Sequence, residues 1–348
     1  MFLGVRPSEA GSDGGAGNAA ARGTGRASVG GRRPFRFGVI GEGVRDRAGL
    51  LATAKAAEAA GYDTFLLRDH LIAAPFGAQL APLVALAAAA GATTRLRLGT
   101  LVLANDFRHP AVLAKEAATL DLLSGGRFEL GIGAGWLREE YERAGIPFDA
   151  AGVRVGRFEE AERALKGLLG GGATSFAGSH YALDGLETFP ASVQRPRPPL
   201  LIGAGSRRML GIAGREADIV GILTSSVASG TLESDPAGMG PASVDEKLGW
   251  VREAAAARFG EIELSLVPSI VVVAADERAA AARWAAERGW DGVGVEEVLA
   301  MPSVFVGSVE RIAGELRARR ARYGFSYYVV SDAALTAFAP VVAALAGT

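Results

Sequence analysis

The sequence of 348 residues contains no cysteine, and this absence excludes several kinds of chemistry at once. Disulfide bonds, zinc–thiolate sites and thiol nucleophiles all require a cysteine sulfur. A chain without disulfides is typical of a reducing compartment, so we expect a cytoplasmic protein. No apolar run in the sequence approaches the ~20 residues that a membrane-spanning helix requires, so we expect no membrane partner.

An excess of charge of one sign is also lacking, since the formal net charge is −1 at pH 7. A nearly neutral chain exerts no long-range attraction on nucleic acid, so we expect no such partner either. Histidine is scarce: only His70, His109 and His180 occur, and no two of them have the spacing of metal ligands. We therefore expect no metal site, and the expected partner is a small-molecule substrate.

Large apolar side chains are nearly absent from residues 1–33, which consist mainly of Gly, Ala, Ser and Arg. Such a segment cannot bury enough apolar surface to offset the entropy lost when its backbone is ordered. We expect a disordered tail over 1–33 and one folded domain over 34–348. A basic arm that binds a polyanion is the alternative.

From Phe35 onward, strand-like and helix-like segments alternate. Eight nearly continuous apolar runs predict strands, each followed by a helical segment: 35–40, 62–67, 96–103, 127–132, 200–203, 218–223, 262–273 and 325–330. Continuous apolar runs are typical of parallel strands whose two faces are both covered. Eight βα units predict a closed (β/α)8 TIM barrel of the α/β class, with an open doubly wound sheet as the alternative.

Two stretches interrupt this alternation and are predicted as insertions. One is a hairpin with a Pro-rich connector at about 175–195, and the other is a loop of turn residues at 225–243, which we expect to be mobile. Neither stretch contains a recognisable motif, although both are expected to contribute substrate contacts.

The ends of the predicted strands contain the candidate site, because both architectures place the active site there. The second strand ends in Asp69-His70. We interpret His70 as a proton carrier, since an imidazole titrates near neutral pH and this one follows a carboxylate. A surface Asp–His pair at the start of a loop is the alternative. His109, before a helix, and His180, in the hairpin, are explained by helix capping, exposure or structure.

Glycine-rich turns end the fourth and fifth strands, at Gly133-Ala134-Gly135-Trp136 and Gly203-Ala204-Gly205-Ser206. Such turns present backbone N–H groups at the start of a helix, which suits a phosphate. The second turn is the better phosphate candidate because Ser206 adds a hydroxyl donor, although packing alone also explains short glycine turns. Neither turn has the G-x-G-x-x-G pattern, which weakens the case for a nicotinamide-binding Rossmann domain.

Four segments resemble the bacterial luciferase superfamily of luciferase-like oxidoreductases. They are "DTFLLRDHL", "RLRLGTLVLANDFRHPAVLAKEAATLDLLSGGRFELGIGAGW", "AGIPFDAAGVRVGRFEEA" and "PRPPLLIGAG", and they cover most of 35–222. More narrowly, the chain resembles the branch that uses the deazaflavin coenzyme F420. The resemblance implies a (β/α)8 barrel that binds one flavin or deazaflavin over its strand ends.

The resemblance also implies residue roles. The Asp–His pair that ends strand 2 in deazaflavin-dependent members is here Asp69-His70, and the histidine exchanges a proton while hydride moves at the ring carbon. Asp69 would orient the imidazole or bond the cofactor, and a non-prolyl cis peptide, here Leu101–Val102, would lie behind the ring. The expected cofactor contacts are Asp69, Leu101, Val102, Ala104, Asn105, Ala134, Gly135 and Trp136, with Gly203, Ala204, Gly205 and Ser206 at the phosphate.

The chain departs from the resemblance at Trp136, where deazaflavin-dependent sugar-phosphate dehydrogenases have a catalytic glutamate. This difference argues against a sugar phosphate as the substrate and leaves His70 without its usual acid partner. The leading hypothesis is an F420-dependent oxidoreductase that transfers a hydride to or from a small organic substrate. The alternatives are an FMN-dependent monooxygenase with a flavin reductase partner, and a non-catalytic flavin- or deazaflavin-binding barrel. A homodimer is left open.

Overall fold

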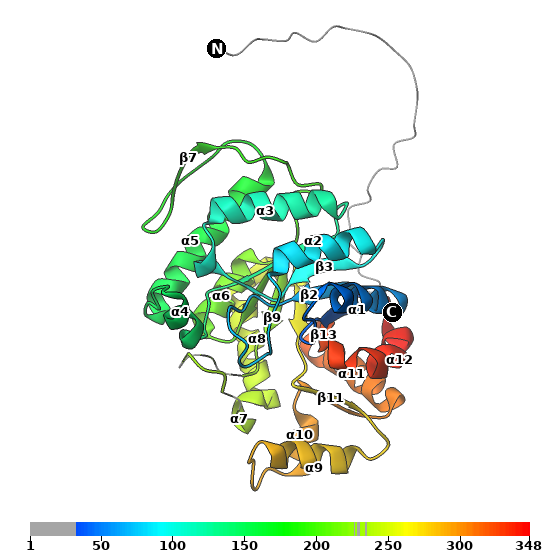
Figure 1. Ribbon diagram of the computed structural model, residues 1–348. Coiled ribbons are helices and arrows are strands. Elements are labelled where there is room, and N and C mark those ends of the chain that lie inside the picture. The colour runs from blue at the N-terminus through cyan, green and yellow to red at the C-terminus, as the bar shows by residue number, and fades with distance from the viewer. Residues whose placement is uncertain (1–32, 226, 228–229, 234) are drawn as a thin grey trace, which may run out of the picture.

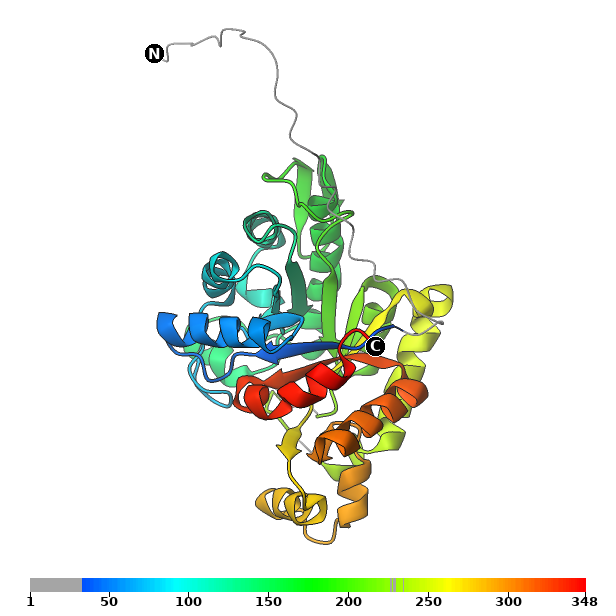
Figure 2. The same ribbon diagram turned by 90° about the vertical axis from the view of Figure 1, so that its right-hand side faces the viewer.

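The structure is a computed structural model that describes residues 33–225, 227, 230–233 and 235–348. The predicted tail, apart from Arg33, lies outside the described residues. The described part is a closed barrel of parallel strands surrounded by helices (Figures 1 and 2). The predicted TIM barrel is therefore confirmed, and the open doubly wound sheet is excluded because the first and last strands pair with each other.

The barrel strands follow one another in chain order around the ring. They are β1 (Arg36–Ile40), β2 (Thr64–Leu67), β3 (Arg97–Thr100), β5 (Phe128–Gly133), β8 (Leu200–Ala204), β9 (Ile219–Ile222), β10 (Glu263–Leu266) and β13 (Phe325–Ser331). Pairing of β1 with β13 and of β3 with β5 closes the ring. The short β4 (Leu103–Ala104) resumes the path of β3 after two residues and also pairs with β5.

Helices cover the outside of the barrel, one after each strand. Among the described residues these are α1 (Arg47–Ala59), α2 (Pro82–Ala92), α3 (Pro110–Leu123), α5 (Ala151–Gly170), α6 (Arg207–Glu216), α8 (Pro241–Ala255), α11 (Val309–Tyr323) and α12 (Leu335–Leu345). Proline is the first residue of α2, α3 and α8, where its missing N–H costs no helical hydrogen bond. The other helical elements are α4 (Arg138–Ala144), α7 (Pro236–Met239), α9 (Glu277–Glu287), α10 (Val295–Ala300), η1 (Asn105–Phe107), η2 (Ala256–Glu261) and η3 (Asp332–Ala334).

Charged side chains fill the barrel at the N-terminal ends of its strands. Arg36 of β1 forms ion pairs with Glu129 of β5 and Glu263 of β10, and Arg97 of β3 also pairs with Glu129. Burial alone would raise the pKa of Glu129, but the two arginines hold it below its ordinary value. Above this layer the interior is apolar, with Leu66 and other aliphatic side chains. These side chains fill the lower interior of the barrel, so the barrel formed by the described residues contains no open channel at this end.

The predicted strand 262–273 is wrong, because the structure divides it in two. β10 ends at Leu266, and β11 (Ile270–Val273) pairs in parallel with β12 (Val304–Gly307) outside the barrel. Pro268 lies between them, and proline has no N–H with which to continue a ladder of hydrogen bonds. The segment from β11 to β12 contains α9 and α10 and forms a small insert with its own apolar core.

The predicted insertion at about 175–195 is confirmed as a hairpin. In it, β6 (Thr174–Ala177) pairs antiparallel with β7 (Ala182–Leu186). The hairpin and the insert lie at opposite ends of the molecule (Figures 1 and 2). The predicted loop 225–243 falls partly on residues outside the description, and its described part already contains α7 and the start of α8. Among the described residues, no helix combines the length and the apolar character needed to cross a membrane.

Candidate functional site

His70 lies just beyond the C-terminal end of β2, in a cage of aromatic rings. Its ring centroid is 5.2 Å from that of Phe76 and 5.9 Å from that of Trp136, which it meets edge to face. Only 8 % of the His70 side chain is exposed. The imidazole therefore has a fixed position at the mouth of the barrel, where the sequence predicted a proton carrier.

A carboxylate that the sequence analysis did not single out contacts this imidazole. Both carboxylate oxygens of Glu140, in α4, lie 3.3 Å from His70 Nδ1. Glu140 Oε2 also accepts a hydrogen bond of 2.9 Å from the backbone N–H of Leu71. The sequence analysis expects His70 to lack its acid partner, and this expectation is corrected. Glu140, which follows Trp136 by four residues in the sequence, contacts the imidazole.

Asp69 binds groups other than the imidazole of His70, which the sequence analysis expects it to orient. Its two oxygens accept hydrogen bonds of 2.6 and 3.1 Å from the guanidinium of Arg108, and Oδ2 also accepts one of 3.1 Å from the N–H of Ala104. In the described part of the chain, no hydrogen bond joins Asp69 to His70. Asp69 thus fixes the end of β2 to the end of β4, and its contact with a cofactor stays a prediction.

The Leu101–Val102 peptide bond is cis, which confirms the expected non-prolyl cis bond. The side chain of Val102 lies beside glycines of two neighbouring strands, Gly133 of β5 and Gly203 of β8. A Cβ added at Gly133 would come within 2.9 Å of Val102 Cγ2, and one added at Gly203 within 3.4 Å of Cγ1. Gly133 pairs with Ala104, and Gly203 with Gly221 of β9. Small residues therefore lie at or next to the ends of β4, β5, β8 and β9, and the absence of Cβ atoms at Gly133 and Gly203 leaves room beside Val102, which suits a planar ring.

A polar network follows the end of β4. The side-chain amide of Asn105, a predicted cofactor contact, already forms hydrogen bonds within it. Asn105 is buried, and its side-chain N–H groups donate to the hydroxyl of Tyr181 at 3.3 Å and to Asp106 at 3.4 Å. Asp106 also forms an ion pair with Arg157 and accepts a hydrogen bond of 3.2 Å from Tyr141. Burial first, and then the charge of Asp106, raise the pKa of Tyr141 above its ordinary value.

The turn after β5 requires glycine at position 135, for reasons of backbone conformation and packing. Gly135 has a φ of 73°, which few residues other than glycine adopt, and a Cβ there would collide with the hydroxyl of Tyr141. Its neighbours Ala134 and Trp136 are half-buried. Gly135 is therefore needed for the fold whether or not this turn contacts a cofactor.

The predicted phosphate segment Gly203–Ser206 begins in β8, which extends to Ala204, and leads through Gly205 and Ser206 directly into α6. The exposed side chain of Ser206 makes no capping hydrogen bond, so the first N–H groups of the helix have no side-chain acceptor from this residue. Such N–H groups bind phosphate well. A Cβ at Gly205 would lie 3.2 Å from the carbonyl oxygen of Leu223, so packing also favours glycine here.

The two remaining histidines lie away from this site. His109 Nδ1 accepts a hydrogen bond of 3.2 Å from the N–H of Ala111 and so caps α3. His180 is exposed at the turn of the hairpin. Both observations agree with the capping and exposure expected from the sequence.

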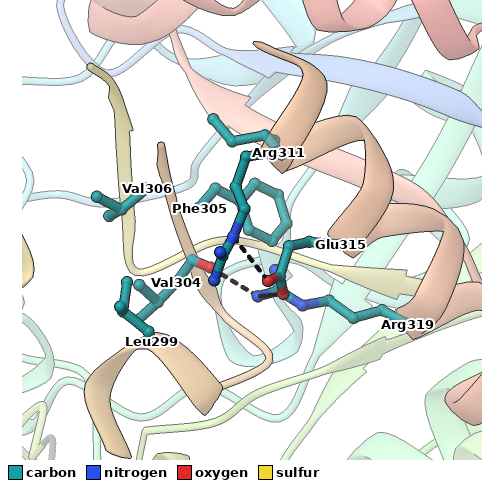
Figure 3. A pocket seen from close by; sticks show the side chains of 8 residues that line it. Leu299, Val304, Phe305, Val306, Arg311, Glu315 and Arg319 are labelled. Carbon is teal, nitrogen blue, oxygen red and sulfur yellow. Dashed lines mark hydrogen bonds and ion pairs between the residues drawn. The ribbon is translucent and has the colours of Figure 1, made fainter. Parts of the chain in front are cut away.

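A small cavity between β12 and α11 does not contribute to the site. Arg311, Glu315 and Arg319 of α11 converge on it, as Figure 3 shows, beside the apolar side chain of Phe305. Its volume is about 10 Å³, which accommodates one water molecule at most. None of the residues that line it lies at a barrel strand end near His70.

Comparisons with known proteins agree with this geometry. A family model described as "Luciferase-like monooxygenase" matches residues 33–339. The chain is 35 % identical over 176 residues to an F420-dependent glucose-6-phosphate dehydrogenase of Beutenbergia cavernae, which is 49 % of this chain and 50 % of that one. It is 34 % identical over 127 residues to an FMNH2-dependent dimethylsulfone monooxygenase of Pseudomonas putida, covering 36 % and 35 % of the two chains.

The fold also matches solved structures along nearly its full length. The coenzyme F420-dependent tetrahydromethanopterin reductase of Methanopyrus kandleri superposes with a TM-score of 0.67 at 18 % identity, covering 89 % of this chain and 97 % of that one. This likeness concerns the fold alone. The chain spans about half the length of the curated relatives it matches. Because the family model extends from the first barrel strand into α12, the chain belongs to the luciferase-like monooxygenase family of flavin- and deazaflavin-dependent oxidoreductases.

Proposed function

We propose that the protein is an F420-dependent oxidoreductase that transfers a hydride to or from a small organic substrate, with His70 as its proton carrier. The observation that supports this most directly is the anchored imidazole at the mouth of the barrel, with Nδ1 against Glu140. Among the described residues, none forms a hydrogen bond with Nε2, so this nitrogen is available to a substrate. A neutral imidazole nitrogen is a suitable proton acceptor near pH 7.

The residues at the strand ends fit a deazaflavin or a flavin. The small residues around Val102 suit one face of a planar ring, and the turn 203–206 suits its phosphate. The bound coenzyme supplies the hydride acceptor or donor. Nε2 of His70 takes up the accompanying proton of the substrate in the oxidative direction and returns it in the reductive direction.

The two arginines beside the end of β2 favour a neutral substrate over a sugar phosphate. Arg68 lies 2.6 Å from Glu42, and Arg108 lies 2.6 Å from Asp69. Arg68 also lies over the ring of Phe76, with its central carbon 4.0 Å from the centroid. Because each of these cations already has a carboxylate partner, an anionic substrate would have to compete with an existing ion pair.

An FMN-dependent monooxygenase is the second candidate function. The relative from Pseudomonas putida, which is named as an FMNH2-dependent enzyme, favours it. The flat surface beside Val102 suits a flavin ring as well as a deazaflavin ring. Such an enzyme would require a flavin reductase as a partner. A barrel that binds either cofactor without catalysis is a third alternative.

A titration with both cofactors tests the proposal. We expect F420 to bind at least ~10-fold more tightly than FMN, which corresponds to about 1.4 kcal/mol. With bound F420, a panel of neutral alcohols and ketones should change the deazaflavin absorbance as hydride is exchanged. Tighter binding of FMN, together with oxygen consumption when reduced FMN is supplied, would instead support the monooxygenase. Binding without turnover of either cofactor would support the third alternative.

We also propose that the protein forms a homodimer through α2 and α3. Large apolar side chains are exposed on these two adjacent helices, at Val84, Val112, Leu122 and Leu123. Phe189 of the Pro-rich connector is exposed beside them, since its carbonyl accepts a hydrogen bond of 2.8 Å from Lys115 of α3. Several large exposed apolar side chains on adjacent elements are typical of a protein–protein interface.

A further inference from the structure

We propose that Glu140 is a positioning residue that holds the His70 imidazole in the tautomer with a proton on Nδ1, so that Nε2 keeps its lone pair toward the substrate. This inference rests on the proton role of His70 proposed above. It assigns to the 7-residue helix α4 a task in the reaction, although its side chains do not touch the reacting atoms.

The contact itself determines which ring nitrogen bears the proton. Both Glu140 oxygens lie 3.3 Å from Nδ1, and an ionised carboxylate can only accept a hydrogen bond. With Glu140 ionised, Nδ1 is therefore the donor in this pair. In a neutral imidazole the other nitrogen then has the lone pair and acts as the acceptor.

The carboxylate is itself held in place by a second bond. The N–H of Leu71, the residue after His70, donates to Glu140 Oε2 at 2.9 Å. Glu140 thus binds both the side chain of one residue and the backbone of the next. The Glu140 side chain is 2 % exposed, so water does not compete effectively for its oxygens.

The aromatic neighbours prevent the ring from turning away from this partner. Trp136 meets the imidazole edge to face at an angle of 84° between the ring planes, and Phe76 lies against it at 34°. Trp136 directly precedes the N-cap residue of α4. One short segment therefore supplies both the ring that confines His70 and the carboxylate that orients it.

Two other carboxylates near His70 at this end of the barrel are already paired with arginines. Glu42 after β1 pairs with Arg68, and Asp69 after β2 pairs with Arg108. Glu140, by contrast, forms no ion pair with lysine or arginine among the described residues. Of these three carboxylates, Glu140 is the one that contacts the imidazole. The tautomer of His70 therefore depends on Glu140 rather than on Asp69.

Nitrogen-15 NMR of the histidine rings tests the assignment directly. With only three histidines in the chain, His109→Gln and His180→Gln identify the His70 signals by elimination. In the wild-type protein without added ligand, we expect Nδ1 of His70 to appear protonated and Nε2 unprotonated. The opposite tautomer in the wild-type protein would overturn the proposal, and this measurement requires no variant of the buried residue.

Glu140→Gln provides the second measurement. The glutamine oxygen can still accept from Leu71 and lies 3.3 Å from Nδ1, but the amide NH2 replaces the other, equidistant oxygen and can only donate to Nδ1, which weakens the preference for a proton on Nδ1. We expect the share of the tautomer with its proton on Nε2 to rise in this variant and to stay unchanged in the matched control Glu139→Gln, since Glu139 is an exposed neighbour paired with Arg143. An unchanged tautomer in folded Glu140→Gln would contradict the positioning role.

Kinetics separate this inference from the proposed function. With F420 and the alcohol or ketone of the panel that reacts fastest, Glu140→Gln should lower kcat by on the order of 10²-fold while KM and the F420 affinity change little. Glu140→Asp should recover part of the rate. If His70→Ala is inactive but Glu140→Gln retains wild-type kcat, the positioning role fails and the proton role stands. If His70→Ala remains fully active, the proton role fails, whatever the tautomer.

Discussion

At the scale of single residues, the proposed proton role of His70 is the central claim to test. We predict that His70→Ala lowers kcat by ~10²–10⁴, the range for loss of a general acid–base. Cofactor affinity should change much less, because the residues proposed to contact the ring and the phosphate belong mostly to other strands. Steady-state rates and a cofactor titration measure the two effects separately.

His70→Asn refines this prediction, because it preserves some hydrogen bonding but removes the titrating group. It should bind cofactor like the wild type, turn over slowly and lose the neutral limb of the pH–rate profile. His180→Ala is the matched control, since that histidine is exposed on the hairpin. Near wild-type turnover of His70→Ala would show that the imidazole is only part of the pocket wall.

Asp69 has a structural contact that can be measured by itself. Asp69→Asn replaces one acceptor oxygen by an NH2 group that faces the Arg108 guanidinium, so a bidentate ion pair is lost. We predict a loss of about 3 kcal/mol in the free energy of unfolding, as for other broken buried pairs. A double-mutant cycle with Arg108→Gln should give a coupling above about 1 kcal/mol. Additive effects would show that the pair contributes little.

Residue by residue, the sequence predicts the part of the site that lies on strands. His70 and Asp69 are found because they end an apolar run that is easy to recognise. Glu140 is not found, because it is 70 residues away along the chain and lies on a helix whose N-cap, Leu137, has no capping side chain. The acidic pair Glu139-Glu140 after a glycine turn is the only local signal, and it also fits an ordinary helix start.

At the scale of elements, the turn before α6 is where phosphate binding can be tested without disturbing the fold. Ser206→Glu adds a negative charge at an exposed N-cap, where it interacts favourably with the helix dipole. The melting temperature should therefore stay the same or rise, while cofactor affinity falls by ~10-fold or more through repulsion of the phosphate. Ser206→Gln is the neutral control. Equal affinities of the two variants would move the phosphate elsewhere.

Helix α5 contains a carboxyl group whose titration should be visible in stability. Glu162 is fully buried, and neither oxygen has a hydrogen-bond partner in the described structure, although Lys166 lies 3.7 Å away. Burial raises the pKa of Glu162 from 4.5 to about 7. Below pH 4.5 both the folded and unfolded states are protonated. Between 4.5 and about 7 the unfolded state loses its proton first, so stability falls as pH rises.

Glu162→Gln removes this titration and supplies the test. The free energy of unfolding of the wild type, relative to the variant, should decrease by up to ~3 kcal/mol between about pH 4 and about pH 8. Urea denaturation at both pH values measures the difference. Glu142→Gln, at an exposed position, should show no such change relative to the wild type. A pH-independent difference for Glu162→Gln would mean that the buried group is ionised throughout.

Element boundaries show why the sequence predicts the barrel better than its insertions. Eight apolar runs identify the strands because each is buried on both faces. The same criterion merged β10 and β11, since eight of the twelve residues in 262–273 are aliphatic, and Pro268 is the main local sign of where the ladder stops. β11 pairs with β12, which lies about thirty residues further on, and no local pattern reports that pairing.

At the scale of the whole molecule, the exposed apolar surface of α2 and α3 leads to the last prediction. Val84 is 76 % exposed and Leu123 63 % exposed, on two helices that lie side by side on one flank of the barrel (Figure 1). We predict that the protein is a dimer at micromolar concentration and that Leu123→Asp or Val84→Asp converts it to a monomer, because a carboxylate in a buried apolar interface has no partner.

Sedimentation or light scattering gives the mass directly. Val153→Asp is the matched control, since Val153 of α5 is also an exposed apolar residue, at 42 %, but lies on another helix. It should leave the mass at twice that of the chain. The Asp variants should keep their circular dichroism spectrum, since both positions are already exposed in the single chain and need no repacking of its core. A wild-type protein that sediments as a 35.8 kDa monomer would contradict the prediction, and the apolar flank would then need another partner to cover it.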